Sequence, residues 1–187
     1  MARAFIGVGS NINPEDNVRR ALRLLARRVR LVAASTVYRT AAIGRPEQPP
    51  FYNCVVEIET AIPPVELKRQ VLRGIEAELG RMRADDRYAP RTIDLDLIMY
   101  DDLVSRGDPV LPDPDIERRP FLAAGIAELA PDLMLPGSGR PIAEIAAALP
   151  APALHVLPEF TNLLRRDIED ERGPGEEARQ AAADRDW

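Results

Sequence analysis

The sequence predicts a single domain of the α+β class, built on an antiparallel sheet. Four short segments have the patterns of strands: residues 4–9, 31–40, 53–60 and 92–100. Helical spacing of apolar residues follows the first and the third of these segments. Of the 187 residues, 45% are hydrophobic and 29% are charged, which is enough apolar material for one sizeable core. We therefore expect a domain over residues 1–159 and a charged C-terminal tail over residues 160–187.

The N-terminal segments predict a strand followed by a helix. Residues 4–9 (AFIGVG) form an apolar run that ends in glycine, as a buried strand often does. Asn13 is a favourable helix N-cap, and Pro14 is favourable at the first helical position. Apolar residues then follow at helical spacing: Val18, Ala21, Leu22, Leu25 and Val29.

Three further segments lead to a second helix. Residues 31–40 are rich in β-branched side chains and predict a second strand. Residues 44–50 (GRPEQPP) contain too much proline for regular structure and predict a loop. Residues 53–60 alternate well enough to predict a third strand. A helix then begins at residues 63–64 and ends with Gly80 as its C-cap.

The fourth predicted strand, residues 92–100 (TIDLDLIMY), alternates strictly. Its apolar side chains are expected on one face: Ile93, Leu95, Leu97 and Met99. Asp94 and Asp96 fall on the other face. The order strand, helix, strand, strand, helix, strand predicts a ferredoxin-like βαββαβ core, a four-stranded antiparallel sheet with helices on one face. The other face of the sheet is then available for a ligand.

The C-terminal part predicts helices and a tail. Two helices are expected after the proline-rich loop at residues 109–115, over residues 120–129 and 142–149. From about Phe160 the chain is highly charged and poor in large apolar residues, so we expect a short helix at most and then a solvated segment. This tail is a candidate for interaction with another protein.

The composition excludes several classes of function. A net charge of −5 argues against a general binder of nucleic acid or anionic membranes. Cys54 is the only cysteine, so an internal disulfide is excluded. His155 is the only histidine, which excludes His-rich zinc sites and Ser-His-Asp triads. No signal-peptide core or apolar run near the ~20 residues of a membrane span is found, so we expect a soluble cytoplasmic protein.

The segment from Arg81 to Asp96 carries the most chemical information. Asp94 and Asp96 project from the same face of a strand, which suits Mg²⁺ because this ion takes a few carboxylates together with phosphate oxygens and water. Four arginines precede the pair: Arg81, Arg83, Arg87 and Arg91. Guanidinium groups match phosphate geometry and keep their charge. Together these features predict a magnesium-nucleotide site for phosphoryl transfer.

Each feature alone has a simpler interpretation. An Asp-x-Asp pair is usually a solvated strand face, and an arginine-rich loop is usually only surface. The combination favours the nucleotide site, since a solvated face does not need arginines concentrated against a carboxylate pair.

The stretch RYAPRTIDLDLIMY, residues 87–100, resembles the signature of the 6-hydroxymethyl-7,8-dihydropterin pyrophosphokinase family. Similarity extends to FIGVGSNI, to VYRTAAIG followed by FYNCVV, to IEAELGRMR and to RRPFLAAGIAELAPDL, over about residues 3–150. The resemblance implies transfer of a pyrophosphoryl group from ATP to 6-hydroxymethyl-7,8-dihydropterin, giving the pterin diphosphate and AMP in folate biosynthesis. It implies two Mg²⁺ ions as cofactors, with ATP and the reduced pterin as partners and neither nucleic acid nor a membrane.

The resemblance also implies roles for individual residues. Asp94 and Asp96 would hold the metal ions, and Arg81 and Arg91 would act with them in catalysis. The residues expected at ATP are Glu76, Arg83, Arg87, Tyr88, Asp113 and Arg119. The residues expected at the pterin are Thr40, Ala41, Ile43, Phe51, Asn53 and Phe121, with the two phenylalanines on either side of the ring.

One residue departs from the family pattern. After the Leu-Pro pair at residues 111–112 the family usually has a histidine near the ATP phosphates, whereas this chain has Asp113. A carboxylate there faces the negative charge of polyphosphate. The alternative is therefore a catalytically weakened pterin- or nucleotide-binding module of the same fold. The intact carboxylate pair and arginines favour the enzyme.

Overall fold

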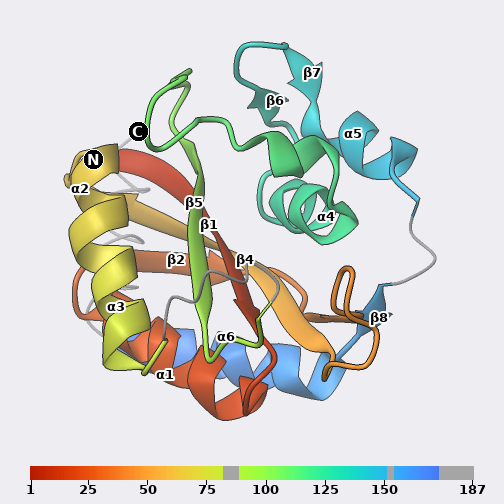
Figure 1. Ribbon diagram of the computed structural model, residues 1–187. Coiled ribbons are helices and arrows are strands. Elements are labelled where there is room, and N and C mark those ends of the chain that lie inside the picture. Colours follow the sequence, from red (N-terminus) through yellow and green to blue (C-terminus); the bar gives the residue numbers. More distant parts are fainter. Residues whose placement is uncertain (82–88, 151–153, 173–187) are drawn as a thin grey trace.

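The computed structural model describes residues 1–81, 89–150 and 154–172. An antiparallel sheet flanked by helices lies at its centre, so the chain has the predicted α+β class (Figure 1). In the described part of the chain this sheet has six strands, in the order β5-β1-β4-β3-β8 with β2 also paired to β4. The strands are β1 (Ala2–Ser10), β2 (Arg30–Ala34), β3 (Tyr38–Thr40), β4 (Phe51–Thr60), β5 (Asp94–Tyr100) and β8 (His155–Val156).

The sheet is wider than the four strands that the sequence predicts. Residues 31–40 form two strands, β2 and β3, and both pair with β4. Between them, the Ser35 N–H donates to the Val55 carbonyl, and the Ser35 hydroxyl accepts from the Val55 N–H, so a side chain replaces one ladder bond. Residues 155–156 add the short strand β8 beyond β3.

The helices predicted from the sequence are all present. They are α1 (Pro14–Ala26), the consecutive segments α2 (Pro64–Glu66), η1 (Leu67–Leu72) and α3 (Arg73–Glu78), α4 (Pro120–Leu129) and α5 (Ile142–Ala148). The 3₁₀ turn η2 (Pro114–Glu117), which was not predicted, lies at the end of the proline-rich loop. Pro14 takes the first position of α1, but Asn13 has a left-handed backbone with φ of 42°, and its side chain makes no capping bond. A second, small sheet pairs β6 (Met134–Leu135) with β7 (Arg140–Pro141). None of the helices within the described ranges is long and apolar enough to cross a membrane.

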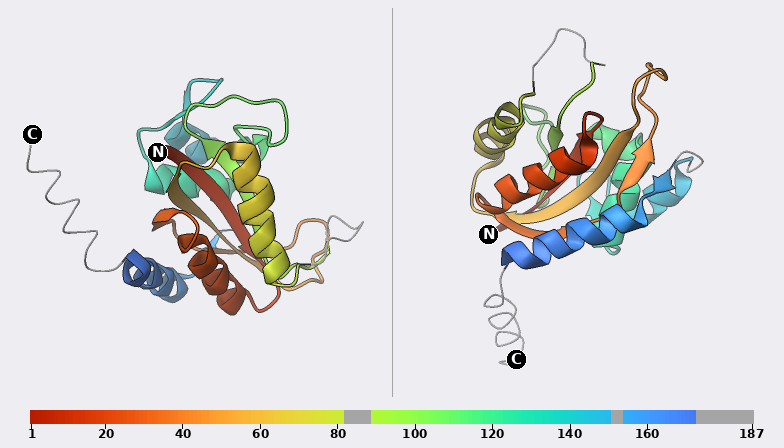
Figure 2. Two further views of the ribbon diagram at one scale, coloured as in Figure 1. Left: turned by 90° about the vertical axis from the view of Figure 1, so that its left-hand side faces the viewer. Right: turned by 90° about the horizontal axis from the view of Figure 1, so that it is seen from below.

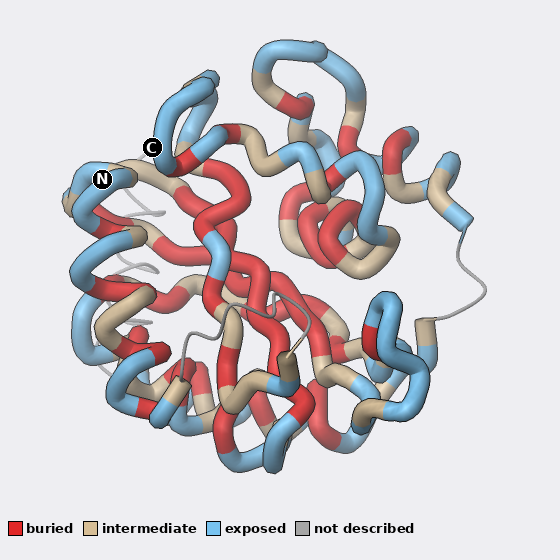
Figure 3. The backbone as a smooth tube through the Cα atoms, in the orientation of Figure 1, coloured by how far each residue is buried: buried red, intermediate tan, exposed pale blue. Residues whose placement is uncertain are grey.

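Two hydrophobic clusters lie on opposite faces of the sheet. The larger cluster packs α1, η1 and α3 against alternate strand residues such as Ile6, Val8 and Val56. The smaller cluster packs α4 and α5 against Phe5 and Val55. Figure 3 shows the buried strands between these layers and the exposed loops around them. The helices that follow β1 and β4 therefore lie on one face of the sheet, as predicted for the core. The two later helices, α4 and α5, cover part of the other face.

Helix α4 covers only one end of the second face. Gly125 lies close against β4, because a Cβ at this position would be 2.7 Å from Val55 Cγ2. At Gly7 of β1 a Cβ would still be 3.1 Å from Leu122 of α4. Two residues further on, at Gly9, the three atoms nearest to such a Cβ belong to Asn53 and Phe51 of β4. The predicted open face is thus confined to the end of the sheet beyond α4.

A β-bulge changes the predicted alternation in β5. Phe5 pairs with Met99 and the next residue, Ile6, pairs with Leu97, so Ile98 is an extra residue in β5. Leu97 packs in the larger cluster as predicted, whereas Met99 packs in the smaller one. The prediction that Met99 shares the face of Leu97 is wrong, because the inserted residue shifts the face of everything after it.

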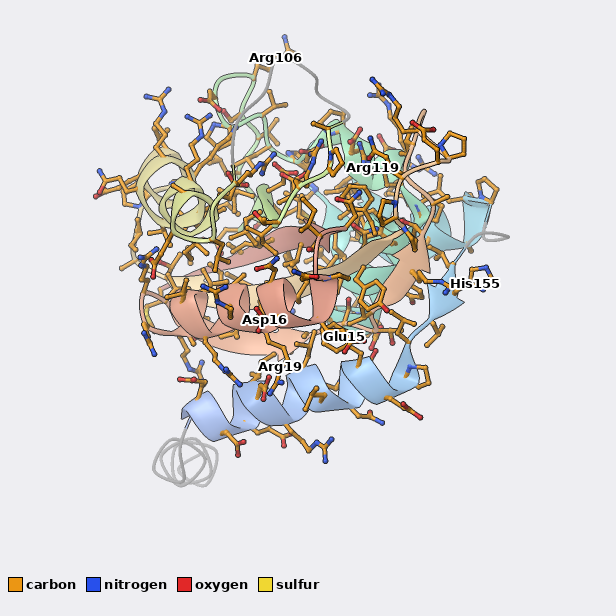
Figure 4. All side chains as sticks on the ribbon, turned by 60° about the horizontal axis from the view of Figure 1, so that its bottom comes forward. Glu15, Asp16, Arg19, Arg106, Arg119 and His155 are labelled. Atoms are coloured by element: carbon orange, nitrogen blue, oxygen red, sulfur yellow. The ribbon has the colours of Figure 1, made fainter. Side chains whose placement is uncertain are left out.

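The predicted start of the tail at residue 160 is also wrong. Helix α6 (Pro158–Arg172) lies beside α1 (Figure 2). Three of its side chains are buried in the larger cluster: Phe160, Leu164 and Ile168. Arg19 of α1, labelled in Figure 4, lies on the side of α1 that faces α6. It donates to Asp167 of α6 through bonds of 2.6 and 3.0 Å. The rest of the predicted tail, residues 173–187, lies outside the described residues.

We expect Leu164→Ala to lower the free energy of unfolding by about 2–4 kcal/mol, because a fully buried leucine leaves a cavity. Leu163→Ala is the matched control, since the neighbouring leucine on the same helix is only partly buried and should cost less. Chemical denaturation measures both. Equally small losses in the two variants would show that α6 adds little to the core.

Candidate functional site

A cavity of about 530 Å³ opens on the uncovered end of the second face. Most of the predicted site residues line it: Thr40, Ala41, Ile43, Phe51, Asn53, Arg81, Arg91, Asp94, Asp96, Asp113, Arg119 and Phe121. Figure 4 shows Arg119 on the side of the sheet opposite to α1 and α6. Arg83, Arg87 and Tyr88 lie outside the described residues.

Gly9 and Asn53 shape one end of the cavity. A Cβ at Gly9 would lie 2.8 Å from Asn53 Oδ1, so a larger residue would displace this side chain. Asn53 is buried, and its Nδ2 donates to Thr40 Oγ1 at 2.7 Å. The amide expected to meet a pterin edge is therefore held in one orientation.

Two phenylalanines reach the cavity from different elements. Phe51 begins β4 and pairs with Thr40 of β3. Phe121 follows Pro120 in the first turn of α4. The guanidinium carbon of Arg91 lies 6.0 Å from the centroid of the Phe51 ring, so this aromatic end adjoins the charged end of the cavity.

Asp94 is held between two arginines at the charged end. Arg81 Nη1 contacts Asp94 Oδ1, and Arg91 Nη1 lies 2.5 Å from Asp94 Oδ2. Arg81 Nη1 also contacts Glu76 Oε1. Burial alone would lower the pKa of the Arg81 guanidinium, but the charges of Asp94 and Glu76 outweigh it and raise this pKa. Two arginines and two carboxylates thus form a charge-balanced network.

Glu76, the second carboxylate of this network, does not line the cavity. Its side chain is buried, and its Oε1 accepts the Leu95 N–H at 2.9 Å as well as the Arg81 guanidinium. This position differs from the expectation that the Glu76 side chain lines the ATP site. In the structure Glu76 joins the end of α3 to β5 between the two aspartates.

The end of α3 determines where Arg81 lies. Gly80 has φ of 74°, and its N–H donates to the Ala77 carbonyl at 3.0 Å. The Arg81 N–H donates to the Glu76 carbonyl at 2.9 Å. This is the Schellman pattern, which requires a residue that tolerates a left-handed backbone, as the predicted glycine C-cap does. The turn brings Arg81 back toward Glu76.

Negative charge accumulates at Asp96, whose pKa is raised to about 7. Desolvation is the largest cause, followed by the charges of Asp94, Asp113 and Glu76, while Arg81 acts in the opposite direction. The residue is nevertheless exposed to solvent within the cavity. Within the described ranges, no group of three or more Asp, Glu, His or Cys residues is arranged to hold a metal ion. A carboxylate pair still fits Mg²⁺, which takes further ligands from phosphate and water.

Asp113 caps the turn η2. Its Oδ1 accepts the Asp115 N–H at 2.8 Å, and burial raises the pKa of its carboxyl group. Arg119 Nε lies 2.6 Å from Asp115 Oδ2, and Arg118 Nη1 lies 3.9 Å from Asp115 Oδ1. These arginines therefore pair with Asp115 and leave the charge of Asp113 facing the cavity.

Asn11, which is absent from the predicted set, connects two loops at the cavity. Its Oδ1 accepts the Arg91 N–H at 2.8 Å, and its Nδ2 donates to the Pro49 carbonyl at 3.3 Å. The sequence feature that could have indicated Asn11 is its position as a polar residue directly after a buried strand. Asn11 itself does not line the cavity; the lining residues outside the predicted set are Gly7, Val8, Gly9, Ala42, Ile98, Asp115, Arg118, Pro120, Leu122, Pro150 and Leu154.

Comparisons with known proteins give a consistent result. The chain is 36% identical over 160 residues to the 2-amino-4-hydroxy-6-hydroxymethyldihydropteridine pyrophosphokinase of Pseudomonas aeruginosa, covering 83% of this chain and 97% of that one. It is 40% identical over 141 residues to the protein of the same name from Methylorubrum extorquens, covering 73% and 88%. Its fold is similar to that of the solved Plasmodium falciparum HPPK-DHPS structure, with a TM-score of 0.63 at 12% identity, covering 78% of this chain and 40% of that longer one.

Residues 5–131, more than half of the chain, match the family model described as 7,8-dihydro-6-hydroxymethylpterin-pyrophosphokinase. The chain therefore belongs to the 7,8-dihydro-6-hydroxymethylpterin-pyrophosphokinase family.

Proposed function

We infer that this protein transfers the pyrophosphoryl group of ATP to 6-hydroxymethyl-7,8-dihydropterin, giving the pterin diphosphate and AMP for folate biosynthesis. One observation carries this function: a single cavity joins a carboxylate- and arginine-rich end to an aromatic end. The pterin hydroxyl oxygen attacks the β-phosphorus of ATP and loses its proton. The bond between the β-phosphorus and the α-phosphate oxygen breaks, so AMP leaves.

The aromatic end is the proposed pterin site. Phe51 and Phe121 supply apolar surface for the two faces of the ring, and Asn53 supplies hydrogen-bonding atoms for its edge. Backbone groups of residues 40–43, which include Thr40, Ala41 and Ile43, border the same end. The polar groups fix the orientation of the ring, which presents its hydroxymethyl group toward the charged end.

Asp94 and Asp96 are the proposed ligands of Mg²⁺, and we propose two ions bound with ATP. The donor set fits because the two carboxylates line the cavity side by side and carry uncompensated negative charge at Asp96. When bound, magnesium would neutralise charge on the phosphates and favour departure of AMP.

The arginines are already engaged before ATP binds, because Arg81 and Arg91 both pair with Asp94. We propose that ATP phosphates take over these guanidinium groups while Asp94 turns to the metal. Each of these ion pairs is then replaced by another, so Arg81, Arg91 and Asp94 all keep a partner of opposite charge. Arg119 also lines the cavity and would complete the proposed phosphate contacts.

The strand order supports the finer description of the fold as ferredoxin-like. Strands β2 and β3 share the position beside β4, which gives the order β5-β1-β4 and then β2 with β3. With the helices after β1 and β4, this is the arrangement of a βαββαβ core.

Incubation with MgATP and the reduced hydroxymethylpterin tests the function, and AMP rather than ADP is the expected product. Asp94→Asn should lower kcat by at least about 100-fold, since it removes a metal ligand and the charge that positions two arginines. Glu117→Gln is the control, because Glu117 pairs with the exposed Arg140 and does not line the cavity. ADP formation by the wild type would refute the reaction, and binding of both ligands without turnover would favour the binding module.

Asp113→Asn should tighten MgATP binding by about three- to tenfold, because it removes a negative charge that faces the phosphates. Asparagine keeps the acceptor that caps η2, so the turn should persist. Calorimetric titration of both proteins with MgATP measures the change. Weaker binding by the variant would mean that Asp113 contributes favourably to the nucleotide site.

Asp96 should make stability depend on pH in the absence of magnesium. Its folded pKa of about 7 lies above its ordinary value of 3.8, so the folded state binds the proton more tightly. The free energy of unfolding should therefore fall as pH rises between these values. Asp96→Asn removes this fall. At pH 8 the free energy of unfolding of the variant should exceed that of the wild type by about 1 kcal/mol, a value reduced for solvent screening, and at pH 4 the two free energies should be equal. Melting curves at both pH values measure this difference, and an equal offset at both would exclude titration of Asp96 as the cause.

A further inference from the structure

Residues 154–172, the C-terminal unit, border the aromatic end of the cavity although they lie outside the region matched by the family model, residues 5–131. The unit contains β8 and α6, and Leu154 lines the cavity. We propose that the C-terminal unit positions the pterin and that Leu154 forms part of the wall against which the pterin binds. This inference rests on the proposed function.

The register of β8 places Leu154 beside the pterin end. β8 pairs antiparallel with β3 through Tyr38 with Val156 and Arg39 with His155. Continued by one residue beyond β8, the same register would place Leu154 opposite Thr40. The Thr40 hydroxyl accepts a hydrogen bond from the Asn53 amide, the polar group proposed for the pterin edge. Leu154 therefore lines the cavity next to this amide.

Two hydrogen bonds from the C-terminal unit hold Val37, the residue directly before β3. The Val37 N–H donates to Thr161 Oγ1 at 2.9 Å in a buried hydrogen bond. The Leu157 N–H donates to the Val37 carbonyl, also at 2.9 Å. Both backbone groups of Val37 are thus held by the C-terminal unit, three residues before Thr40.

The same helix supports the start of β4. Phe160 packs against Tyr52 with ring centroids 5.7 Å apart, in the larger core cluster. Successive strand residues point to opposite faces, so Phe51 and Asn53, on either side of Tyr52, face the cavity. Packing on Tyr52 therefore fixes the backbone that presents both proposed pterin contacts.

The short length of β3 explains why this support matters. β3 has three residues, and beyond it the segment up to Pro50 is largely exposed. A strand this short, with solvent on its outer edge, would open easily. β8 pairs with the outer edge of β3, and α6 packs against the face of the sheet opposite to the cavity. The proposed pterin-binding part of the cavity therefore depends on the C-terminal unit.

Leu154→Ala tests the direct contact. The KM for the pterin should rise about five- to tenfold through lost apolar contact, with the KM for ATP and the melting temperature unchanged. Val156→Ala is the matched control, since Val156 is two residues further along the chain, in β8, is 52% exposed and does not line the cavity. An unchanged pterin KM in Leu154→Ala, or an equal rise in both variants, would overturn the role of Leu154.

Thr161→Val tests positioning through α6, with Thr161→Ser as the conservative rescue that keeps the acceptor for Val37. We expect the valine variant to raise the pterin KM several-fold, with the ATP KM unchanged, and the serine variant to restore it. Equal changes in both KM values would indicate general destabilisation and refute the positioning role. A wild-type protein that neither binds the pterin nor forms AMP would instead refute the proposed function itself.

Discussion

The site depends on a network of partly buried ion pairs formed by Glu76, Arg81, Asp94 and Arg91. Charges removed from water are costly unless each has a partner, and here each carboxylate meets at least one guanidinium group. Glu76 extends the network to the backbone of β5 through the Leu95 N–H. The end of α3, the start of β5 and the loop before it are therefore positioned together. Removal of one member would leave a partner uncompensated, so the network specifies geometry more than it adds net stability.

A gradient of side-chain size along β1 divides the second face of the sheet. Phe5 packs under α4 and α5, Gly7 lies at the edge of α4, and Gly9 lies at the floor of the cavity. These three residues share one face, since strand side chains alternate. The absence of side chains at positions 7 and 9 gives Leu122 and Asn53 their space. The same strand thus supplies core at one end and a ligand-sized hollow at the other.

Features set by local chemistry were predictable, whereas those set by distant contacts were not. The glycine C-cap of α3 and the shared location of Asp94 and Asp96 follow from backbone conformation and from alternation. The bulge that moves Met99 depends on the pairing of β5 with β1, which no window of sequence reveals. The tail was misjudged for a similar reason: three apolar residues at four-residue spacing in α6 suffice for burial because α1 and β2 lie opposite them. Roles assigned to Arg83, Arg87 and Tyr88 rest on the resemblance alone.

The distribution of charge in the cavity makes metal and nucleotide depend on each other. Within the described residues, the arginines at the charged end pair with Asp94 and Asp115, whereas Asp96 and Asp113 have no ion pair. ATP without a cation would bring its phosphates toward these two carboxylates and would be repelled. A cation without ATP would meet Asp94 with both oxygens already bound by guanidinium groups. In the proposed site, only the two together supply positive charge for Asp96 and Asp113 and phosphates that could take over Arg81 and Arg91. We therefore expect the ligand-free network to favour entry of the metal–nucleotide complex over either component alone.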